Sequence, residues 1–377
     1  MKISISEPYV NGEELHEIKN VIKKNEISSY GKVITKFEKK INKITNIKYS
    51  VACSSGTAAL HTALKVLGVK KNDEVLVPTI TFIATINVIK YLNAHPIFFG
   101  CDEYFNIDHR DVIEFIKKKT FFKNGYSFNK KTKRKITAII PVHIWGNAAN
   151  LSEICKICKK RNIKILEDAT EAFGTFYNNG KSVGSLGDIG VFSFNGNKII
   201  TTGNGGAIVS NNRSYVSKCR YFISQATDDN IKYLHNEIGF NYRFSGLNAA
   251  FGLGQLKKFK FYMDRKKKIH KIYKDLIDPI PNFSLLNNPK YSKNNNWMNI
   301  LQFDPKLQNK IIKNFKKNNI QTKFVWLPNH QQVSYKDCEK FNIRNLDKFF
   351  KGAICLPSSV NLKKKDIFRV VNILKNL

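Results

Sequence analysis

The chain has 377 residues, of which 42% are hydrophobic and 12% aromatic, so it can bury a sizeable core and global disorder is excluded. Its length favours two domains over one. The net charge of +34 would attract polyanions, but the lysines are spread over the whole chain. The densest basic cluster, residues 117–135, is typical of a solvated loop and helix end. Since we find no zinc-finger, RNA-binding or helix-turn-helix pattern, we expect no nucleic-acid partner.

The amino terminus and the longest apolar run both argue against export and membrane insertion. The first residues lack the basic and then apolar layout of a secretory signal. The longest charge-free apolar run, residues 75–89, is interrupted by Pro78 and by threonine and asparagine, and it is too short to span a bilayer. We therefore expect a soluble, cytoplasmic protein.

The seven cysteines are an odd number without regular spacing, which argues against a disulfide framework. Cys155 and Cys158 form a CxxC, but no second pair and no histidine stands near them. They lie in LSEICKICKKRN, an amphipathic helical pattern with both thiols on or near one face. A lone CxxC is a weak signal for zinc or redox chemistry, so we interpret it as part of a buried helix and expect no metal.

Between residues 50 and 210, short apolar runs alternate with helical patterns such as TAALHTALKVLG (57–68) and DVIEFIKKK (111–119). This alternation predicts βαβ units and a mainly parallel sheet. Ligands bind such sheets at the carboxyl ends of the strands, where His143, Asp168 and Asn195 follow the apolar runs. The predicted strands are DEVLVP (73–78), HPIFFG (95–100), ITAIIPVH (136–143), IKILED (163–168) and IGVFSF (189–194).

The character of the sequence changes near residue 250. Lysine-rich helical patterns over residues 255–277 lead into a break rich in Pro and Asn at 279–296, and mixed strand and helix patterns follow to the end. We therefore predict an α/β fold with a large domain over residues 1–250 and a smaller α+β domain over residues 251–377.

Two segments of the first domain are candidates for binding an anion and a ring nitrogen. SSGTAAL (54–60) opens a helical pattern, and N–H groups at a helix N-terminus attract anions. Ser55 acting only as an N-cap explains these residues equally well. In IKILEDATEAFG, Asp168 ends an apolar strand and could keep a pyridinium nitrogen protonated, which makes a cofactor ring an electron sink. A helix N-cap or a metal ligand competes on equal terms for this carboxylate.

A third segment, GSLGDIGVFSFNGNKIITTGNGG (184–206), places Lys198 four residues past an apolar strand. A lysine partly removed from water and near other cations has a lowered pKa, as Schiff-base chemistry requires. The small neighbouring residues leave room for a planar cofactor. Taken alone, however, the segment would be interpreted as one more surface lysine.

The fourth segment, GFNYRFSGLNAAFG (239–252), has Asn241 and Arg243 on a turn before a helix, where they could bind an anion or merely cap and pair. In their order and spacing, EDATEAFG, GSLGD, FSFNGNKIITTG and NYR resemble the DegT/DnrJ/EryC1/StrS family of pyridoxal 5′-phosphate (PLP) nucleotide-sugar aminotransferases. The resemblance covers nearly the whole chain. It implies a fold-type-I aminotransferase, with a large PLP domain, a small carboxyl-terminal domain, and a homodimer whose active sites lie at the interface.

The resemblance also implies roles for individual residues. Lys198 would carry PLP as a Schiff base and move a proton during catalysis, and Asp168 would pair with the pyridine nitrogen. The other implied cofactor residues are Gly56, Thr57 and Ser193 at the phosphate, Phe82 stacking on the ring, Glu171 near the phenolic oxygen where many members have Gln, and Asn241 at the phosphate of the neighbouring subunit's cofactor. The presence of Lys198 argues against the family's deoxygenating branch, in which a histidine replaces this lysine.

The resemblance implies a ping-pong reaction, with glutamate as the amino donor and a nucleotide-diphosphate keto sugar as the acceptor. FSFNGNKIITTG is close to GDP-perosamine synthase and to aminotransferases of bacillosamine and legionaminic-acid pathways, and residues 322–332 lean toward the second group. We expect 4-amination of a UDP-linked 2-acetamido-4-keto-6-deoxy sugar for surface-glycan biosynthesis. The GDP-linked 4-keto-6-deoxymannose is the alternative. Candidate sugar or nucleotide contacts, each equally compatible with a structural role, are Tyr30, Lys323, Asn329 and His330.

Two residues depart from the family pattern. Asn204 stands where Glu or Gly is usual, and Lys323 stands where Arg is expected, so that a point charge replaces a bidentate fork. Proteins of other classes also remain open. A PLP-fold regulator or nucleic-acid binder would show salt-sensitive DNA binding and no amino transfer. A PLP lyase or racemase would take an amino acid as its sole substrate.

Overall fold

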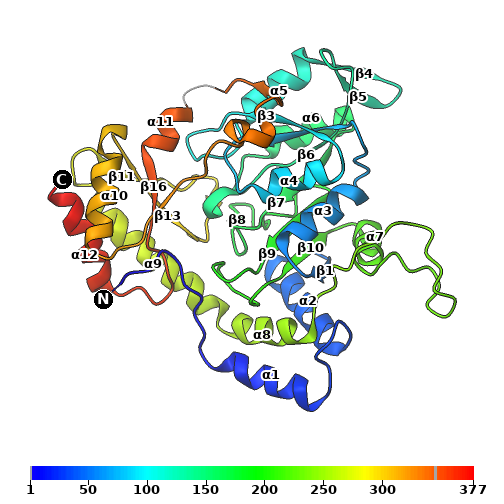
Figure 1. Ribbon diagram of the computed structural model, residues 1–377, viewed down its shortest axis with the longest axis horizontal. Coiled ribbons are helices and arrows are strands. Elements are labelled where there is room, and N and C mark those ends of the chain that lie inside the picture. Colours follow the sequence, from blue (N-terminus) through cyan, green and yellow to red (C-terminus); the bar gives the residue numbers. More distant parts are fainter. Residues whose placement is uncertain (1, 344–345) are drawn as a thin grey trace.

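The computed structural model describes residues 2–343 and 346–377, and its central element is one large sheet (Figure 1). The strand order is β1-β10-β9-β7-β6-β2-β3-β15, with β5 and then β4 added beside β6. Along this order every pair from β9 to β15 is parallel, whereas β1, β10 and β9 pair antiparallel. The predicted, mainly parallel sheet is confirmed. Its strands are β1 (Tyr49–Cys53), β2 (Glu74–Pro78), β3 (His95–Phe99), β4 (Thr120–Lys123), β5 (Tyr126–Asn129), β6 (Lys135–Ile139), β7 (Lys164–Asp168), β9 (Ile189–Ser193), β10 (Gly206–Ser210) and β15 (Glu339–Phe341).

The strands differ from the sequence-based prediction in two respects. Five strands of the sheet, β1, β4, β5, β10 and β15, were not among the predicted runs. β4, β5 and β15 have only three or four residues, and β10 begins with a glycine that marks no strand. β6 ends at Ile139, four residues before the predicted run ends. Pro141 follows closely and has no N–H with which to continue the ladder.

Helices cover both faces of the sheet, because successive side chains of each strand point to opposite sides. On β2, Val75 and Val77 pack with α3, α4 and α7, whereas Leu76 packs with α5 and α6 on the other face. None of the helices within the described residues is both long and apolar enough to cross a membrane. The helices of this part are α1 (Glu13–Lys23), α2 (Lys32–Thr45), α3 (Gly56–Val66), α4 (Ala84–Tyr91), α5 (His109–Lys118), α6 (Ser152–Arg161), α7 (Arg213–Ile223) and α8 (Gly246–Lys257).

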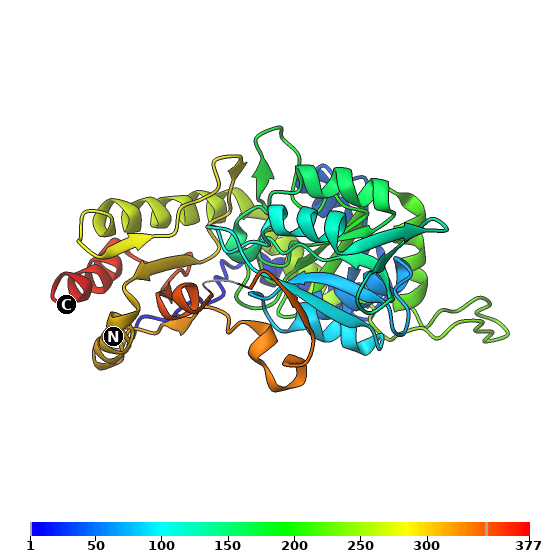
Figure 2. The same cartoon turned by 90° about the horizontal axis from the view of Figure 1, so that it is seen from above.

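The carboxyl-terminal part has its own sheet and its own core, and lies at one end of the molecule (Figure 2). The strand order is β11-β13-β16-β14, with every pair antiparallel. The core of this part contains side chains from residues 269–374 together with Ile3. Its elements are α9 (Phe259–Ile277), β11 (Phe283–Leu285), β13 (Asn299–Phe303), α10 (Gln308–Lys317), β14 (Lys323–Phe324), α11 (Leu346–Lys351), β16 (Ala353–Leu356) and α12 (Lys364–Lys375), and a separate pair joins β8 (Phe176–Tyr177) to β12 (Ser292–Lys293).

The chain crosses between the two parts more than once. Ile3 pairs with Ile320, which brings the amino terminus to the smaller sheet. In the other direction, β15 leaves the carboxyl-terminal part and pairs with β3 of the large sheet. The domain division at residue 250 therefore stays a prediction. Dividing the chain there would separate two segments, residues near Ile3 and β15, from the part of the structure with which they pair.

Glu167 lies beside Asp168 in β7 and fixes the loop that follows. Its Oε1 accepts the N–H groups of Leu186 and Gly187 at 2.6 Å each, and its Oε2 accepts the Gly184 N–H at 2.8 Å. His143 Nε2 lies 3.0 Å from the same Oε2. The GSLGD segment is therefore held by one carboxylate against the strand that carries Asp168.

We expect Glu167→Gln to lower the free energy of unfolding by about 3 kcal/mol, because an amide nitrogen would face N–H groups that have no other acceptor in this buried place. The measurement is urea denaturation at fixed protein concentration. The matched control is Glu153→Gln on α6, where an exposed carboxylate pairs with Lys156 and its loss should produce no measurable change. Equal midpoints for the two variants would contradict this account of Glu167.

Candidate active site

A cavity of about 350 Å³ lies where β7 and β9 end and α3 begins. Seven of the eight predicted cofactor residues line it, and Lys323 does so as well. Since the carboxyl ends of parallel strands are where such sheets bind ligands, this cavity is the candidate active site. Its lining consists of Ser55, Gly56, Thr57, Leu60, Phe82, Ala84, Thr85, Asp168, Thr170, Glu171, Ser193, Asn195, Asn197, Lys198, Asn204, Trp297, Lys323 and Trp326.

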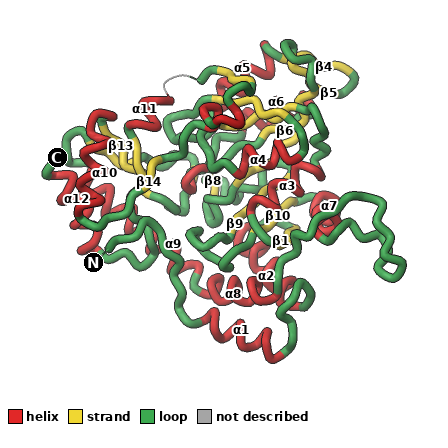
Figure 3. The backbone as a smooth tube through the Cα atoms, viewed as in Figure 1, coloured by secondary structure: helices red, strands yellow, loops and turns green. Residues whose placement is uncertain are grey.

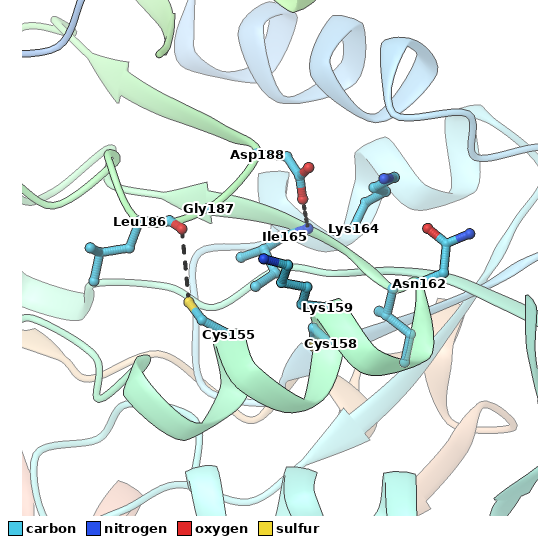
Figure 4. A pocket seen from close by; sticks show the side chains of 10 residues that line it. Cys155, Cys158, Lys159, Asn162, Lys164, Ile165, Leu186, Gly187 and Asp188 are labelled. Carbon is cyan, nitrogen blue, oxygen red and sulfur yellow. Dashed lines mark hydrogen bonds between the residues drawn. The ribbon is translucent and has the colours of Figure 1, made fainter. Parts of the chain in front are cut away.

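A second hollow lies at the opposite end of β7 and contains the CxxC pair (Figure 4). Cys155 and Cys158 lie on α6, so the predicted helix is confirmed. Burial raises the pKa of the Cys155 thiol to about 12 and also raises that of Cys158, which keeps both thiols protonated at neutral pH. Within the described residues, no group of three His, Cys, Asp or Glu side chains is arranged to hold a metal ion.

Lys198 extends into the active-site cavity, and its side chain is 14% exposed. Its Nζ lies 3.8 Å from Glu171 Oε1 and 4.0 Å from the ring centroid of Trp297. Burial lowers the pKa of Lys198, while the carboxylates of Glu171 and Asp168 oppose this shift. The expectation of a lowered pKa is confirmed, but the expected cause is partly wrong. The neighbouring charges that act on Lys198 are anions, so desolvation alone lowers the pKa.

Asp168 is buried at the end of β7 and is held by two donors. Its Oδ2 accepts the Thr85 hydroxyl at 2.6 Å, and its Oδ1 accepts the Thr170 N–H at 3.1 Å. Both donors fix the orientation of the carboxylate. No helix begins in residues 169–180, so the alternative of Asp168 as a helix N-cap is excluded.

Glu171 is buried between the amino group of Lys198 and the backbone of Trp145. Its Oε2 accepts the Trp145 N–H at 2.7 Å, while its other oxygen faces Lys198. Burial raises the pKa of Glu171; Lys198 and the Trp145 N–H oppose this shift, and Asp168 adds to it. The cavity thus contains two carboxyl groups, Asp168 held by two donors and Glu171, whose pKa burial raises.

The N-terminus of α3 forms a tight cradle at the floor of the cavity. The Ser55 side chain accepts the Ala58 N–H at 3.0 Å, so the predicted N-cap is confirmed. A Cβ atom added to Gly56 would lie 3.0 Å from Ser193 Cβ and 3.3 Å from Thr170 Cγ2. A side chain at position 56 would therefore crowd Ser193 and Thr170 beside the first N–H groups of this helix, and these groups and the helix dipole favour an anion.

Two of the predicted substrate residues, Asn329 and His330, make hydrogen bonds to other residues of the chain. Asn329 is buried, and its amide donates to the backbone oxygens of Thr79 and Thr81 at 3.0 and 2.8 Å. His330 Nδ1 lies 2.7 Å from the Thr79 hydroxyl. Neither residue lines the cavity, and both tie the segment after β14 to the end of β2. A structural role explains these contacts.

The remaining predicted residues lie at or beyond the rim. Lys323 lines the cavity from β14. Tyr30 is 70% exposed, and the guanidinium of Arg243 lies 5.0 Å from its ring centroid. Asn241 is exposed on the loop between α7 and α8 and does not line the cavity of its own chain.

Sequence reasoning missed several residues of this cavity. Thr85 stands four positions after Thr81 in PTITFIAT, a spacing that fits one helix face, but nothing there points to its bond with Asp168. Trp297 and Trp326 come from the carboxyl-terminal part, more than 90 residues from Lys198, and no local pattern marks them.

Comparison with known proteins agrees with this geometry. Residues 8–375 match the model of the DegT/DnrJ/EryC1/StrS aminotransferase family. GDP-perosamine synthase from Escherichia coli O157:H7 is 35% identical over 373 residues, covering 98% of this chain and 96% of the relative. UDP-4-amino-4,6-dideoxy-N-acetyl-beta-L-altrosamine transaminase from Campylobacter jejuni (strain 81-176) is 29% identical, covering 91% and 89%. The structure of Helicobacter pylori PseC, an aminotransferase of pseudoaminic acid biosynthesis, has a TM-score of 0.89 at 26% identity, covering 100% and 99%.

The chain therefore belongs to the DegT/DnrJ/EryC1/StrS aminotransferase family. It is a PLP-dependent nucleotide-sugar aminotransferase, with the large sheet and the smaller carboxyl-terminal sheet of that fold.

We expect Gly56→Ala to weaken the binding of PLP to the cofactor-free protein about tenfold, because the added methyl group displaces the Ser193 hydroxyl at the α3 N-terminus. The measurement is a titration of the cofactor's visible absorption. The matched control is Gly196→Ala, whose added Cβ meets nothing within 4 Å. If both variants bind PLP equally, the cradle is not the phosphate site.

Proposed function

We propose that the enzyme carries PLP on Lys198 and moves an amino group from glutamate to the 4-keto carbon of a nucleotide-linked 4-keto-6-deoxy sugar, in a cytoplasmic setting. The observation that carries this proposal is the single cavity that contains Lys198, the buried Asp168 and the open N-terminus of α3. A desolvated amine, a buried and oriented carboxyl group and an anion cradle are the three features that PLP requires of its site.

The side chains fit PLP residue by residue. Gly56, Thr57 and Ser193 surround the cradle and would hold the phosphate. The Phe82 side chain is 52% exposed at the cavity, where its ring would lie against the pyridine ring. Glu171, close to Lys198, would lie near the phenolic oxygen.

PLP, when bound, supplies an electron sink for the carbanion formed at the substrate carbon. Asp168 would hold the proton on the ring nitrogen, and its bonds from Thr85 and the Thr170 N–H keep it aimed there. Lys198, once its amino group is free, would move the proton at the reacting carbon. The buried walls on either side of Lys198 would exclude water from this step.

Two sugars are candidates for the acceptor. The 29% identity to the UDP-amino-sugar transaminase supports the UDP-linked 2-acetamido sugar, our first expectation from sequence. The 35% identity to GDP-perosamine synthase supports the GDP-linked 4-keto-6-deoxymannose. Because GDP-perosamine synthase is more similar and covers more of the chain, the comparison favours the GDP-linked sugar over the UDP-linked sugar.

A homodimer with shared active sites would complete the cavity. The loop between α7 and α8 extends away from the body of the chain and contains neither helix nor strand (Figure 3). Three apolar side chains on it are almost fully exposed: Ile231 at 90%, Tyr233 at 80% and Ile238 at 81%. Such a surface is typical of an interface, and a second copy that covers it would bring Asn241 toward the neighbouring cofactor. A monomer in analytical ultracentrifugation would contradict this.

The first test of the proposal is the visible spectrum of the purified protein. We expect a Schiff-base band that glutamate bleaches, and borohydride should place the label on the peptide with Lys198. Lys198→Arg should lose the band and reduce amino transfer at least about a thousandfold. No band after PLP is supplied, or a label on another lysine, would refute the assignment and favour a PLP-fold regulator.

The second test assays both sugars with the same enzyme preparation. We expect amination of the GDP-linked 4-keto-6-deoxy sugar with a kcat/KM at least about tenfold above that of the UDP-linked sugar, since a site built for one base leaves polar groups unpaired with the other. The product is measured by mass spectrometry. Turnover of the UDP-linked sugar alone would restore the first expectation from sequence.

A further inference from the structure

We propose that Trp297 is a positioning residue that holds the amino group of Lys198 whenever this group is not bonded to the cofactor. The inference rests on the proposed role of Lys198 as the cofactor lysine. Trp297 precedes β13 in the carboxyl-terminal part, whereas Lys198 follows β9 of the large sheet, so the contact joins the two parts of the molecule.

Contacts other than the one with Lys198 hold the Trp297 ring in place. The residue is 2% exposed, and its indole N–H donates to the backbone oxygen of Asn197 at 2.6 Å. Its backbone N–H donates to Asn295 Oδ1 at 2.8 Å. The ring is thus bonded to the residue directly before Lys198, which sets its face against the lysine side chain.

A buried lysine supports Trp297 from behind. Lys266 of α9 is 2% exposed and donates to the backbone oxygens of Trp297, at 2.9 Å, and of Ser358. Burial lowers the pKa of Lys266 to about 7. These bonds tie the Trp297 backbone to α9 and to the loop after β16, so the ring has little freedom to turn away from the cavity.

The ring face attracts the ammonium form of Lys198 without competing with it for the cofactor. An ammonium 4.0 Å from the centroid is attracted by the ring's negative face, and this attraction is strongest where water is excluded. The ring accepts no proton and forms no bond with an aldehyde, so it does not compete with the cofactor for the amine. Glu171 faces Lys198 at 3.8 Å, and Asp168 is the other charge acting on it. The free amine would rest between Glu171 and Trp297 while the substrate is bonded to the cofactor.

The aromatic residues at the outer wall differ from Trp297. Phe82 and Trp326 pack on each other with ring centroids 5.4 Å apart, and Phe82 is half exposed. They line the same cavity, but the ring whose face lies over Lys198 Nζ is that of Trp297. Trp326 therefore provides a matched control for the loss of an indole from this site.

The test measures how readily the Lys198 amine reacts with acetic anhydride as a function of pH, in the cofactor-free full-length chain, by mass spectrometry of the Lys198 peptide. Only the neutral amine reacts, so the midpoint reports the pKa. Because the ring stabilises the ammonium, Trp297→Leu should move the midpoint to lower pH by about one pH unit, and Trp297→Phe by less. Trp326→Leu should not move it. A midpoint that stays in place or rises in Trp297→Leu would overturn the proposal.

A kinetic measurement on the holoenzyme adds a second criterion. With a mispositioned amine, Trp297→Leu should lower kcat about tenfold with less than a twofold change in KM for the sugar, and Trp297→Phe should recover part of the loss. A raised KM at unchanged kcat would make Trp297 a substrate wall and contradict the proposal. The labelling result does not depend on which lysine carries PLP, so failure of the Lys198 assignment is recognised separately by borohydride mapping.

Discussion

The active site depends on one constraint, the removal of Lys198 from water beside two carboxyl groups. Desolvation alone would favour a neutral amine, and the carboxylates alone would favour an ammonium. The net effect lowers the pKa of Lys198, while the two carboxylates limit this shift. The surrounding structure maintains this balance. Thr85 and the Thr170 N–H hold Asp168, the Trp145 N–H holds Glu171, and the Trp297 ring covers the remaining side of the amine.

Much of this arrangement could be predicted from sequence, because the decisive residues follow directly after apolar strands. Asp168 ends β7 and Lys198 follows β9 by a few residues, so a parallel sheet brings them to the same edge. Seven of the eight cofactor residues that the family resemblance implies also line this cavity. Ser55 as an N-cap was predictable for a similar reason, since capping is a local property of a few neighbouring residues.

The residues that escaped prediction are those that reach the site through tertiary packing. Trp297 meets Lys198 across about a hundred positions of sequence, and the donor to Asp168 lies on a helix whose own pattern gives no indication of it. The expected cations beside Lys198 were wrong, because the charges that act on its pKa are the carboxylates of Glu171 and Asp168, which reach it through the tertiary fold. Asn329 and His330 show the converse, since the side chains of two candidate substrate residues bind Thr79 and Thr81 of the protein itself.

The path of residues 323–341 has a consequence for how the enzyme opens. This segment begins in the smaller sheet as β14, contributes Lys323 and Trp326 to the cavity wall, and ends in the large sheet as β15 beside β3. It is anchored by backbone hydrogen bonds at both ends. A hinge motion between the two sheets would pull on both anchors and on the segment between them. These two pairings therefore resist separation of the two sheets on this side of the cavity, and the cavity wall that contains Lys323 and Trp326 is held between them.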